Sequence, residues 1–562
     1  MKKSVRLFSL VAVLILLVTA VGTAGAKPAG TISVQILAVN DFHGNLEPPL
    51  GSSGRITTST GTVNAGGAEY LATHINSLRA TNPNTVVVSA GDLIGASPLL
   101  SALFHDEPTI EAFNQIGLDF NAVGNHEFDE GWHELVRMQE GGCHPVDGCL
   151  DGDDFAGANF QFLAANVVRK DSGKTIFPAY KIRSFDDAKI AFIGMTLEGT
   201  PLIVTPSGIS DLTFKDEADT VNALVPQLKA KGVKTIVVLI HEGGVQALPA
   251  PYNGCVGISG AIVDIVNHFD PEVDVVISGH THNAYNCTIN NMLVTSAASF
   301  GRLVTDVDLT IDRTSGQVTS MSANNNIVTR DVPKDSLLTT LIAKYNVIAA
   351  PLANRIIGSI TADITRANSP AGESALGDVI ADGQLEATVD QGAVVAFMNP
   401  GGIRADLTYL SSPVGEGDGN VTYGEMFTVQ PFGNSMVTLT LTGAQIDTLL
   451  EQQFIGCGQT TATGQKILQV SNGFTYSWST SAPACDKVDS STIKINGVTV
   501  DPSGSYRVTV NSFLADGGDG FTTLVQGTNR VGGDVDTDAF AAYFGAHSPV
   551  APGPQDRITQ IP

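Results

Sequence analysis

The sequence predicts a two-domain protein of mixed α/β and α+β class, with an αββα-type N-terminal domain joined by a helix to a C-terminal α/β domain. The 562 residues are 43% hydrophobic and 15% charged, which supplies apolar side chains for more than one large core. Short apolar runs alternate with helix-like stretches in the first half, whereas Gly, Thr and Val in alternating strands dominate the second. This change of texture indicates a domain boundary.

The first half contains apolar runs that are rich in β-branched side chains. Continuous runs of this kind are typical of strands buried on both faces, as in layered α/β sheets. We expect them to form a domain over residues 27–332, and they read ISVQILAV, TVVVSAGD, KIAFIGMT, KTIVVLIH and EVDVVISGH.

A connecting helix is predicted over residues 333–356. Either Asp335 or Ser336, just after Pro333, is a candidate N-cap. Apolar residues recur at helical spacing at Leu338, Leu341, Ile342, Tyr345 and Ile348. The remaining residues, 357–562, contain alternating strands such as MVTLTLTG and YRVTVNSF and form the predicted second domain.

Residues 1–26 resemble a secretory signal peptide. Three basic residues precede the apolar run 7–18, and small residues at 24–26 suit cleavage. An uncleaved anchor is the alternative, although the run is shorter than the roughly 20 residues that span a bilayer. We therefore expect a secreted, extracellular protein without a membrane anchor, periplasmic where the source has an outer membrane.

Six cysteines, an even number, suit an oxidising compartment. Their order suggests the local disulfides Cys143–Cys149, Cys255–Cys287 and Cys457–Cys485, although six cysteines allow 15 connectivities. None has CxxC spacing or adjoins a candidate base, so we interpret them as structural rather than catalytic or zinc-binding.

The chain is acidic, with 31 Lys and Arg against 56 Asp and Glu and a formal charge of −25. A surface of this sign repels nucleic acid backbones and anionic membranes. We expect no nucleic acid polymer as a partner, and the charge favours a monomer.

Five short polar motifs in the first domain each follow an apolar or β-rich run. Because the carboxyl ends of strands form the ligand crevice of open α/β sheets, these placements converge on one rim. Together they offer two Asp, one Asn and four His ligands, a mixture that suits Zn, Mn or Fe. The motifs are Asp41-Phe42-His43, Gly91-Asp92, Gly124-Asn125-His126-Glu127, His241 and Gly279-His280-Thr281-His282.

Each motif taken alone is more often a turn or a hydrogen-bonded pair than a metal site. Their joint occurrence in this order is what favours a metal centre. The other six histidines have no such context, and we interpret them as surface or structural residues: His74, His105, His133, His144, His268 and His547.

The ordered motifs DxH, GD, GNHE, H and GHTH resemble the calcineurin-like metallophosphoesterase superfamily, and most closely its 5′-nucleotidase branch. NDFHGNLE at 40–47, GNHEFD at 124–129, NPGGIR at 399–404 and FLADGGDGF at 513–521 carry this resemblance. It extends to bacterial UDP-sugar hydrolases and ecto-5′-nucleotidases over nearly the whole mature chain. It implies a four-layer αββα metallophosphoesterase domain followed by a nucleotide-binding domain.

The resemblance implies two divalent metal ions, Zn, Mn or similar. Such ions lower the pKa of a shared water, whose hydroxide attacks the phosphoryl group, and they neutralise the phosphoryl oxygens. The implied ligands are Asp41, His43 and His282 for one ion, Asn125, His241 and His280 for the other, and Asp92 for both.

The resemblance also assigns His126 to the transition state, at the phosphoryl or leaving-group oxygen, with Asp129 orienting it. Their i, i+3 spacing places both on one face if HEFD begins a helix. A histidine that only orients a metal ligand is the alternative.

In the second domain the resemblance implies a substrate-binding set. Two rings stacked on a base tolerate different bases, which predicts broad nucleobase use. The set comprises Arg366 and Arg404 for phosphate or carboxylate-like groups, Asn399 for the base, Phe432 and Phe513 as the base sandwich, and Asp519 for ribose hydroxyls.

The implied activity is that of a 5′-nucleotidase, which hydrolyses nucleoside 5′-phosphates to nucleoside and inorganic phosphate in nucleotide catabolism. A 2′,3′-cyclic-nucleotide phosphodiesterase or a UDP-sugar or NAD pyrophosphatase on the same site is the nearest alternative. A nucleotide-binding surface protein without activity is a third possibility, which the complete set of seven metal-ligand positions disfavours.

Overall fold

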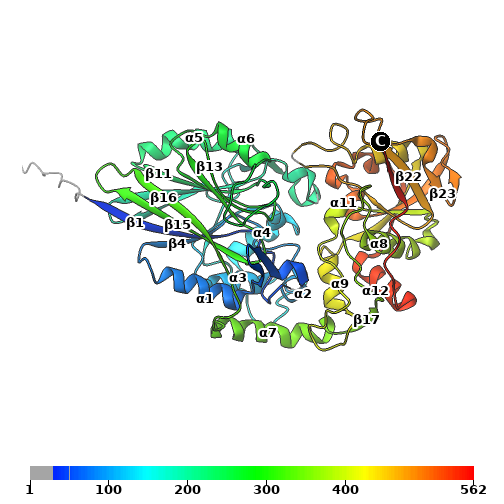
Figure 1. Ribbon diagram of the computed structural model, residues 1–562, viewed down its shortest axis with the longest axis horizontal. Coiled ribbons are helices and arrows are strands. Elements are labelled where there is room, and N and C mark those ends of the chain that lie inside the picture. The colour runs from blue at the N-terminus through cyan, green and yellow to red at the C-terminus, as the bar shows by residue number, and fades with distance from the viewer. Residues whose placement is uncertain (1–29, 50, 205, 462) are drawn as a thin grey trace, which may run out of the picture.

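The computed structural model of the protein describes residues 30–49, 51–204, 206–461 and 463–562. Two domains lie side by side, and helix α7 (Ser336–Ala353) runs below the first toward the second (Figure 1). The predicted signal peptide, residues 1–26, lies outside the described residues.

Two six-stranded sheets form the centre of the N-terminal domain. The first has the order β16-β15-β1-β4-β5-β6, with β1 (Thr31–Val39), β4 (Thr85–Ser89), β5 (Phe120–Ala122), β6 (Gln161–Leu163), β15 (Leu303–Asp312) and β16 (Val318–Ile327). The second has the order β13-β14-β12-β11-β9-β8, with β8 (Tyr180–Phe185), β9 (Ala188–Thr196), β11 (Thr235–His241), β12 (Val275–Ser278), β13 (Ala284–Ile289) and β14 (Met292–Ala297). The neighbours β1, β4 and β5 are parallel, as are β11 and β12, so within each sheet their carboxyl ends lie at one edge.

The two sheets pack face to face through alternate strand residues. Ile36 of β1 and Val88 of β4 share a buried cluster with Phe192 of β9 and Leu239 of β11. Leu37 belongs instead to the cluster under the helices, because successive strand residues face opposite sides of a sheet.

Helices cover the outer faces of both sheets, which confirms the predicted four-layer αββα arrangement (Figure 1). α1, α3 and α4 pack on the first sheet, and α5 and α6 pack on the second. The helices are α1 (Ala68–Arg79), α2 (Leu99–Ala102), α3 (Glu107–Ile116), α4 (Trp132–Glu140), α5 (Glu217–Ala230) and α6 (Ala261–His268). Two short ribbons pair β2 (Arg55–Thr58) with β3 (Gly61–Asn64) and β7 (Val167–Arg169) with β10 (Leu212–Phe214).

Helix α7 begins as the sequence predicts, with Asp335 as the N-cap whose carboxylate accepts two backbone amide hydrogen bonds. Leu338 and Tyr345 are buried, but Ile348 is 41% exposed and Ala349 is buried instead. The predicted apolar repeat is wrong at this position because the buried stripe advances four residues from Tyr345.

By length and composition alone, α7 is the one helix of the described ranges that could cross a membrane. Helix α7 packs against α3 of the first domain and α9 (Tyr423–Val429) of the second.

The second domain contains a five-stranded and a four-stranded sheet with helices, as predicted for its α/β class. The larger sheet has the order β21-β18-β25-β20-β26, with β18 (Val395–Met398), β20 (Ser435–Thr442), β21 (Gln469–Val470), β25 (Ser505–Asn511) and β26 (Thr528–Val535). The smaller has the order β24-β23-β22-β27, with β22 (Phe474–Ser479), β23 (Lys494–Ile495), β24 (Val498–Thr499) and β27 (Ile558–Ile561). The remaining elements are β17 (Ile356–Ser359), β19 (Asn420–Thr422), α8 (Ala375–Glu386), α9 (Tyr423–Val429), α10 (Gly443–Glu451), α11 (Ser512–Ala515) and α12 (Asp536–His547).

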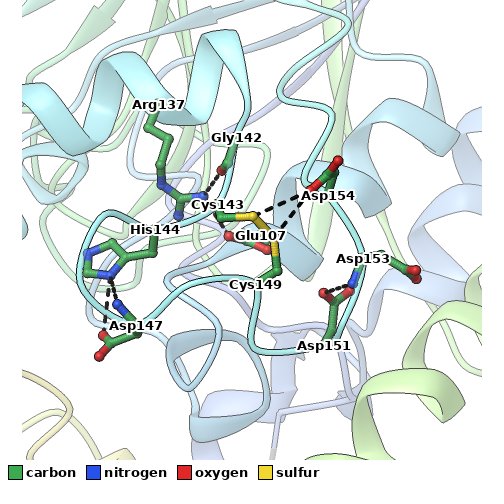
Figure 2. The surroundings of a disulfide bond; sticks show 10 residues. All are labelled: Glu107, Arg137, Gly142, Cys143, His144, Asp147, Cys149, Asp151, Asp153 and Asp154. Atoms are coloured by element: carbon green, nitrogen blue, oxygen red, sulfur yellow. Dashed lines mark hydrogen bonds and ion pairs between the residues drawn. A yellow bond between two sulfur atoms is a disulfide. The ribbon is translucent and has the colours of Figure 1, made fainter.

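The three predicted disulfides are confirmed: Cys143–Cys149, Cys255–Cys287 and Cys457–Cys485. The first closes a short loop that follows α4 (Figure 2). Within the described ranges no cysteine is free.

Asp536, the first residue of α12, makes the stability of the fold depend on pH. Burial raises the pKa of this carboxyl from 3.8 to about 7. Because the folded state then binds the proton more tightly than the unfolded chain, the free energy of unfolding falls as the pH rises from about 4 to about 7. We expect Asp536→Asn to remove this contribution, at most about 4 kcal/mol. Urea unfolding of both proteins across this pH range measures it, and an equal loss in the two would contradict the assignment.

Candidate metal and active site

Five strand ends bring the predicted metal ligands together at the edge where the two sheets meet. The strands and the residues at or just after their carboxyl ends are β1 with Asp41 and His43, β4 with Asp92, β5 with Asn125, β11 with His241, and β12 with His280 and His282. Donor atoms of Asp41, His43 and His282 lie within 4.8 Å of one another, and so do donor atoms of Asp92, His241 and His280. The predicted convergence on one rim is therefore present.

The backbone turns sharply where these ligands leave their strands. Left-handed φ angles, which non-glycine residues adopt at a cost in strain, cluster at functional sites. Five of the seven predicted ligands have them: Asp41 at 50°, His43 at 47°, Asp92 at 49°, His280 at 68° and His282 at 55°. The surrounding hydrogen bonds hold the chain in this conformation so that the side chains point to one place.

In the first group, two imidazoles meet through ring nitrogens. His43 Nε2 lies 3.1 Å from His282 Nε2, and Asp41 Oδ1 lies 3.4 Å from the same His282 atom. His43 donates its Nδ1 proton to the Gly95 carbonyl at 2.8 Å, which leaves a lone pair on Nε2. Burial holds the pKa of His43 well below its usual value, so this imidazole is neutral and able to bind a metal.

In the second group, His241 is fully buried and its Nδ1 donates to the Ala90 carbonyl at 2.8 Å. Its Nε2 lies 2.9 Å from Asp92 Oδ2 yet makes no hydrogen bond of good geometry. A buried polar atom without a partner is costly, and a cation beside both atoms would satisfy them. His280 Nδ1 lies 3.0 Å from Asn125 Oδ1, which brings the amide oxygen into the same group.

Asp92 lies between the two groups. Its Oδ2 is 2.9 Å from His241 Nε2 and 3.6 Å from His43 Nε2, while Oδ1 accepts the His126 backbone amide at 2.9 Å. Although burial alone would raise the pKa of Asp92, the neighbouring histidines, His241 and His126 foremost, together hold it well below its usual range, and the carboxylate is ionised. The donor set of carboxylates, an amide oxygen and imidazoles fits divalent ions such as Zn or Mn.

The loop after β5 has a glycine for a steric reason. A Cβ on Gly124 would lie 2.2 Å from Asp92 Oδ1, so any other residue would displace that carboxylate. Glu127 holds the same loop, since its carboxylate accepts the backbone amides of Gly124 at 2.6 Å, Asp92 at 2.9 Å and Leu93 at 2.9 Å.

His126 and Asp129 form the predicted pair. His126 begins the short 3-10 helix His126–Phe128, and its Nδ1 lies 2.9 Å from Asp129 Oδ2. Burial lowers the pKa of His126, but the carboxylates of Asp129 and Asp92 together outweigh this effect and raise the pKa above its usual value. Because Nδ1 is bound to Asp129, Nε2 is left for a substrate oxygen.

A cleft of about 850 Å³ separates the two domains and joins the metal-ligand edge to the predicted substrate residues. From the first domain Asn125, His126 and His280 line it. From the second domain it is lined by Asn399, Arg404, Phe432, Phe513 and Asp519, all named from the sequence. The Phe432 ring stacks on the His126 ring at a centroid distance of 5.7 Å, so the two domains touch beside the metal edge.

One of the predicted substrate residues does not line the cleft, and two others bind each other. Arg366 does not line the cleft, and its guanidinium instead donates to the Arg404 backbone carbonyl at 2.7 Å. Asn399 Nδ2 donates to Asp519 Oδ2 at 2.8 Å, so these two buried side chains bind each other. A Cβ on Gly518 would lie 2.4 Å from the Phe513 ring, which explains this glycine in the loop.

Sequence reasoning missed several residues that line the cleft. Lys466 pairs with Asp519, and Glu198, Glu217 and Glu242 place three carboxyl groups on the first-domain wall. None of them belongs to a recognisable motif. Lys466 stands in the segment GQKILQV, which offers no signal beyond a strand that follows it.

Family comparisons agree with this geometry. Residues 34–284 match the calcineurin-like phosphoesterase family, and residues 355–526 match the 5′-nucleotidase C-terminal domain. Calcineurin-like phosphoesterases use divalent metals, as the donor groups above would require.

Individual relatives extend over most of the chain. Cell wall protein Lmo0130 of Listeria monocytogenes is 32% identical over 93% of this chain and 68% of that protein. Endonuclease YhcR of Bacillus subtilis is 32% identical over 94% of this chain, which spans only 41% of that protein. The solved 5′-nucleotidase precursor of Thermus thermophilus matches with a TM-score of 0.76 and 26% identity, over 94% of this chain and 99% of that one. The chain therefore belongs to the 5′-nucleotidase family, with a calcineurin-like phosphoesterase domain followed by a 5′-nucleotidase C-terminal domain.

Proposed function

We propose that the protein is a secreted 5′-nucleotidase that holds two divalent metal ions and releases inorganic phosphate from nucleoside 5′-phosphates. The observation that carries this proposal is the interdomain cleft, where His126 and His280 face Phe432 and Phe513. A nucleotide has a phosphate at one end and an aromatic base at the other, which suits a metal edge opposite two aromatic rings.

The chain's own residues have separable tasks in this proposal. When bound, the two ions would supply a water of lowered pKa and neutralise the phosphoryl oxygens. Asp129 holds His126 Nδ1, so that Nε2 donates a proton to the leaving oxygen. The Arg404 guanidinium, whose Cζ lies 5.9 Å from the centre of the Phe432 ring, binds the phosphate beside the base site.

The base site is tested by Phe513→Ala. Base stacking on an aromatic ring contributes about 1–3 kcal/mol, so we expect KM for AMP to rise roughly 5- to 150-fold. Ribose 5-phosphate, which has no base, is the matched control, and its KM should be the same for wild type and variant. An unchanged KM for AMP would contradict the assignment of Phe513.

The substrate class is tested by comparing kcat/KM for AMP, UDP-glucose, NAD, 2′,3′-cyclic AMP and single-stranded DNA. We expect AMP to have the highest value, and DNA to be resistant because of the formal charge of −25. Cleavage of another substrate without phosphate release from AMP would contradict the proposed substrate and leave the metal site unaffected.

We further propose that the protein is exported. Three disulfides support an oxidising compartment, and one relative is named a cell wall protein. Mass spectrometry of protein from the culture medium should find an N-terminus at Lys27. Retention inside the cell with the first 26 residues intact would contradict export.

A further inference from the structure

A second cluster of metal-binding side chains lies beside the cleft wall, apart from the groups described above. Four side chains each offer one donor atom within 4.8 Å of the others: His105, Glu130, Glu134 and His144. Three of these residues line a cavity of about 30 Å³ whose wall also includes His126 and Asp129. The cluster thus adjoins the His126–Asp129 pair without sharing a residue with it.

The two remaining donor groups within the described ranges contain no imidazole. The group of Cys143, Cys149 and Asp154 contains a disulfide, so its sulfurs are not thiolates. The group of Glu198, Asp216 and Glu217 contains carboxylates alone, and two of them already accept backbone amides. The His105 cluster, by contrast, combines two imidazoles with two carboxylates.

The four donors come from three separate segments that are fixed in place. His105 lies between α2 and α3, and His144 lies in the disulfide loop. Glu130 just precedes α4, and Glu134 lies in the first turn of that helix. Arg137 of α4 donates to the Gly142 carbonyl at 2.7 Å and ties that loop to its helix (Figure 2). The same guanidinium binds Glu134, whose oxygens keep further lone pairs for a cation.

The two imidazole rings lie against each other, stacked with centroids 3.7 Å apart and an interplanar angle of 16°. Because nearly parallel rings direct their in-plane lone pairs along separate planes, one ring must rotate for both to bind a single ion. The side chains of His105, Glu134 and His144 are 16%, 11% and 14% exposed, and that of Glu130 is 46% exposed. Three of the four donors are therefore largely shielded from water, and the site opens to solvent on the Glu130 side.

Asp147 occupies the position of a residue that orients one metal-ligating histidine, His105. Its Oδ2 lies 3.0 Å from His105 Nε2, whereas its backbone amide donates to His144 Nδ1 at 3.1 Å. The other nitrogen of His105, Nδ1, lies 2.8 Å from Glu130 Oε2. A histidine that binds a metal through one nitrogen usually donates the other N–H to a carboxylate, and Asp147 provides that carboxylate for His105.

We propose that His105, Glu130, Glu134 and His144 bind a zinc ion at a site distinct from the metal centre of the cleft. Four nitrogen and oxygen donors suit tetrahedral zinc, whereas calcium and magnesium prefer oxygen alone. Because Glu130 directly follows Asp129, an ion here also anchors the segment that holds His126.

The test counts zinc in purified, zinc-loaded protein by mass spectrometry of the metal. The double variant His105→Ala/His144→Ala should carry one zinc per chain fewer than wild type. The control His74→Ala/His268→Ala, which changes two histidines outside every donor group, should keep the wild-type count. Because the readout is a difference, it does not depend on how many ions the cleft holds. Equal zinc content in wild type and the His105→Ala/His144→Ala protein overturns the proposal.

Two further measurements keep the test decisive if that double variant fails to fold. Asp147→Asn preserves shape and should weaken zinc binding at this site about 10- to 100-fold. Crystals of wild type should show anomalous scattering at the zinc edge between the four side chains. In the absence of that peak, the cluster is an ion-pair network in which Glu130 and Asp147 hold a protonated His105, and the proposal fails.

Discussion

Asp92→Asn is expected to reduce phosphate release from AMP at least about 100-fold. Substitution of residues that merely orient metal ligands already lowers metal affinity or activity about 10- to 100-fold, and Asp92 is itself a predicted ligand. Asp92 Oδ2 lies within 3.6 Å of an imidazole nitrogen from each donor group, His43 Nε2 and His241 Nε2. Asparagine keeps its size but removes the charge that offsets the cations. Metal content and initial rate, measured on the same sample, should fall together.

Asp274→Asn is the matched control for this change. Asp274 is a half-buried carboxyl at the amino end of β12, the opposite end of that strand from His280, and its Oδ2 accepts the Ile236 backbone amide at 2.9 Å. The control should retain metal and activity. Full activity of Asp92→Asn with normal metal content would contradict the bridging role.

His126→Ala is expected to lower kcat for AMP by about 10²- to 10⁴-fold, the range that positioned proton donors contribute. His126 lines the cleft, and its one observed side-chain hydrogen-bond partner within the described ranges is Asp129. The metal ligands remain in place, so metal content should be unchanged. Rapid-quench or steady-state phosphate assays give kcat, and metal analysis gives the occupancy.

His133→Ala is the control for His126→Ala, since His133 is exposed on α4 and contacts Trp132. Its kcat should match wild type. A His126→Ala protein that loses its metal would instead assign His126 to holding the metal centre, and one with normal kcat would remove it from the reaction.

The metal edge could be predicted from sequence because each ligand sits beside a strand end. The carboxyl ends of parallel strands lie at one edge of a sheet. The motifs around Asp41, Asp92 and His241 therefore predict both the types of ligand and the edge at which they meet. The αββα layers follow from the same buried strands. The local disulfides followed from their short separations.

The rest depends on contacts between distant segments. His105 and His144 were interpreted as surface or structural residues because neither lies in a motif, and only the fold stacks their rings. Lys466 reaches Asp519 from 53 residues away through the packing of the second domain. Arg366 matched a family position, but its own local hydrogen bonds turn it to the Arg404 backbone.

The central claim, a metal-dependent 5′-nucleotidase, is tested most directly by phosphate release from AMP with the purified mature protein. One sample is loaded with zinc or manganese, and a second is stripped with a chelator and then reconstituted. The proposal predicts release in the loaded sample, loss after stripping, and recovery on reconstitution. Two results would contradict the proposal: no phosphate release from AMP by a sample verified to contain metal, or phosphate release that a chelator leaves unchanged.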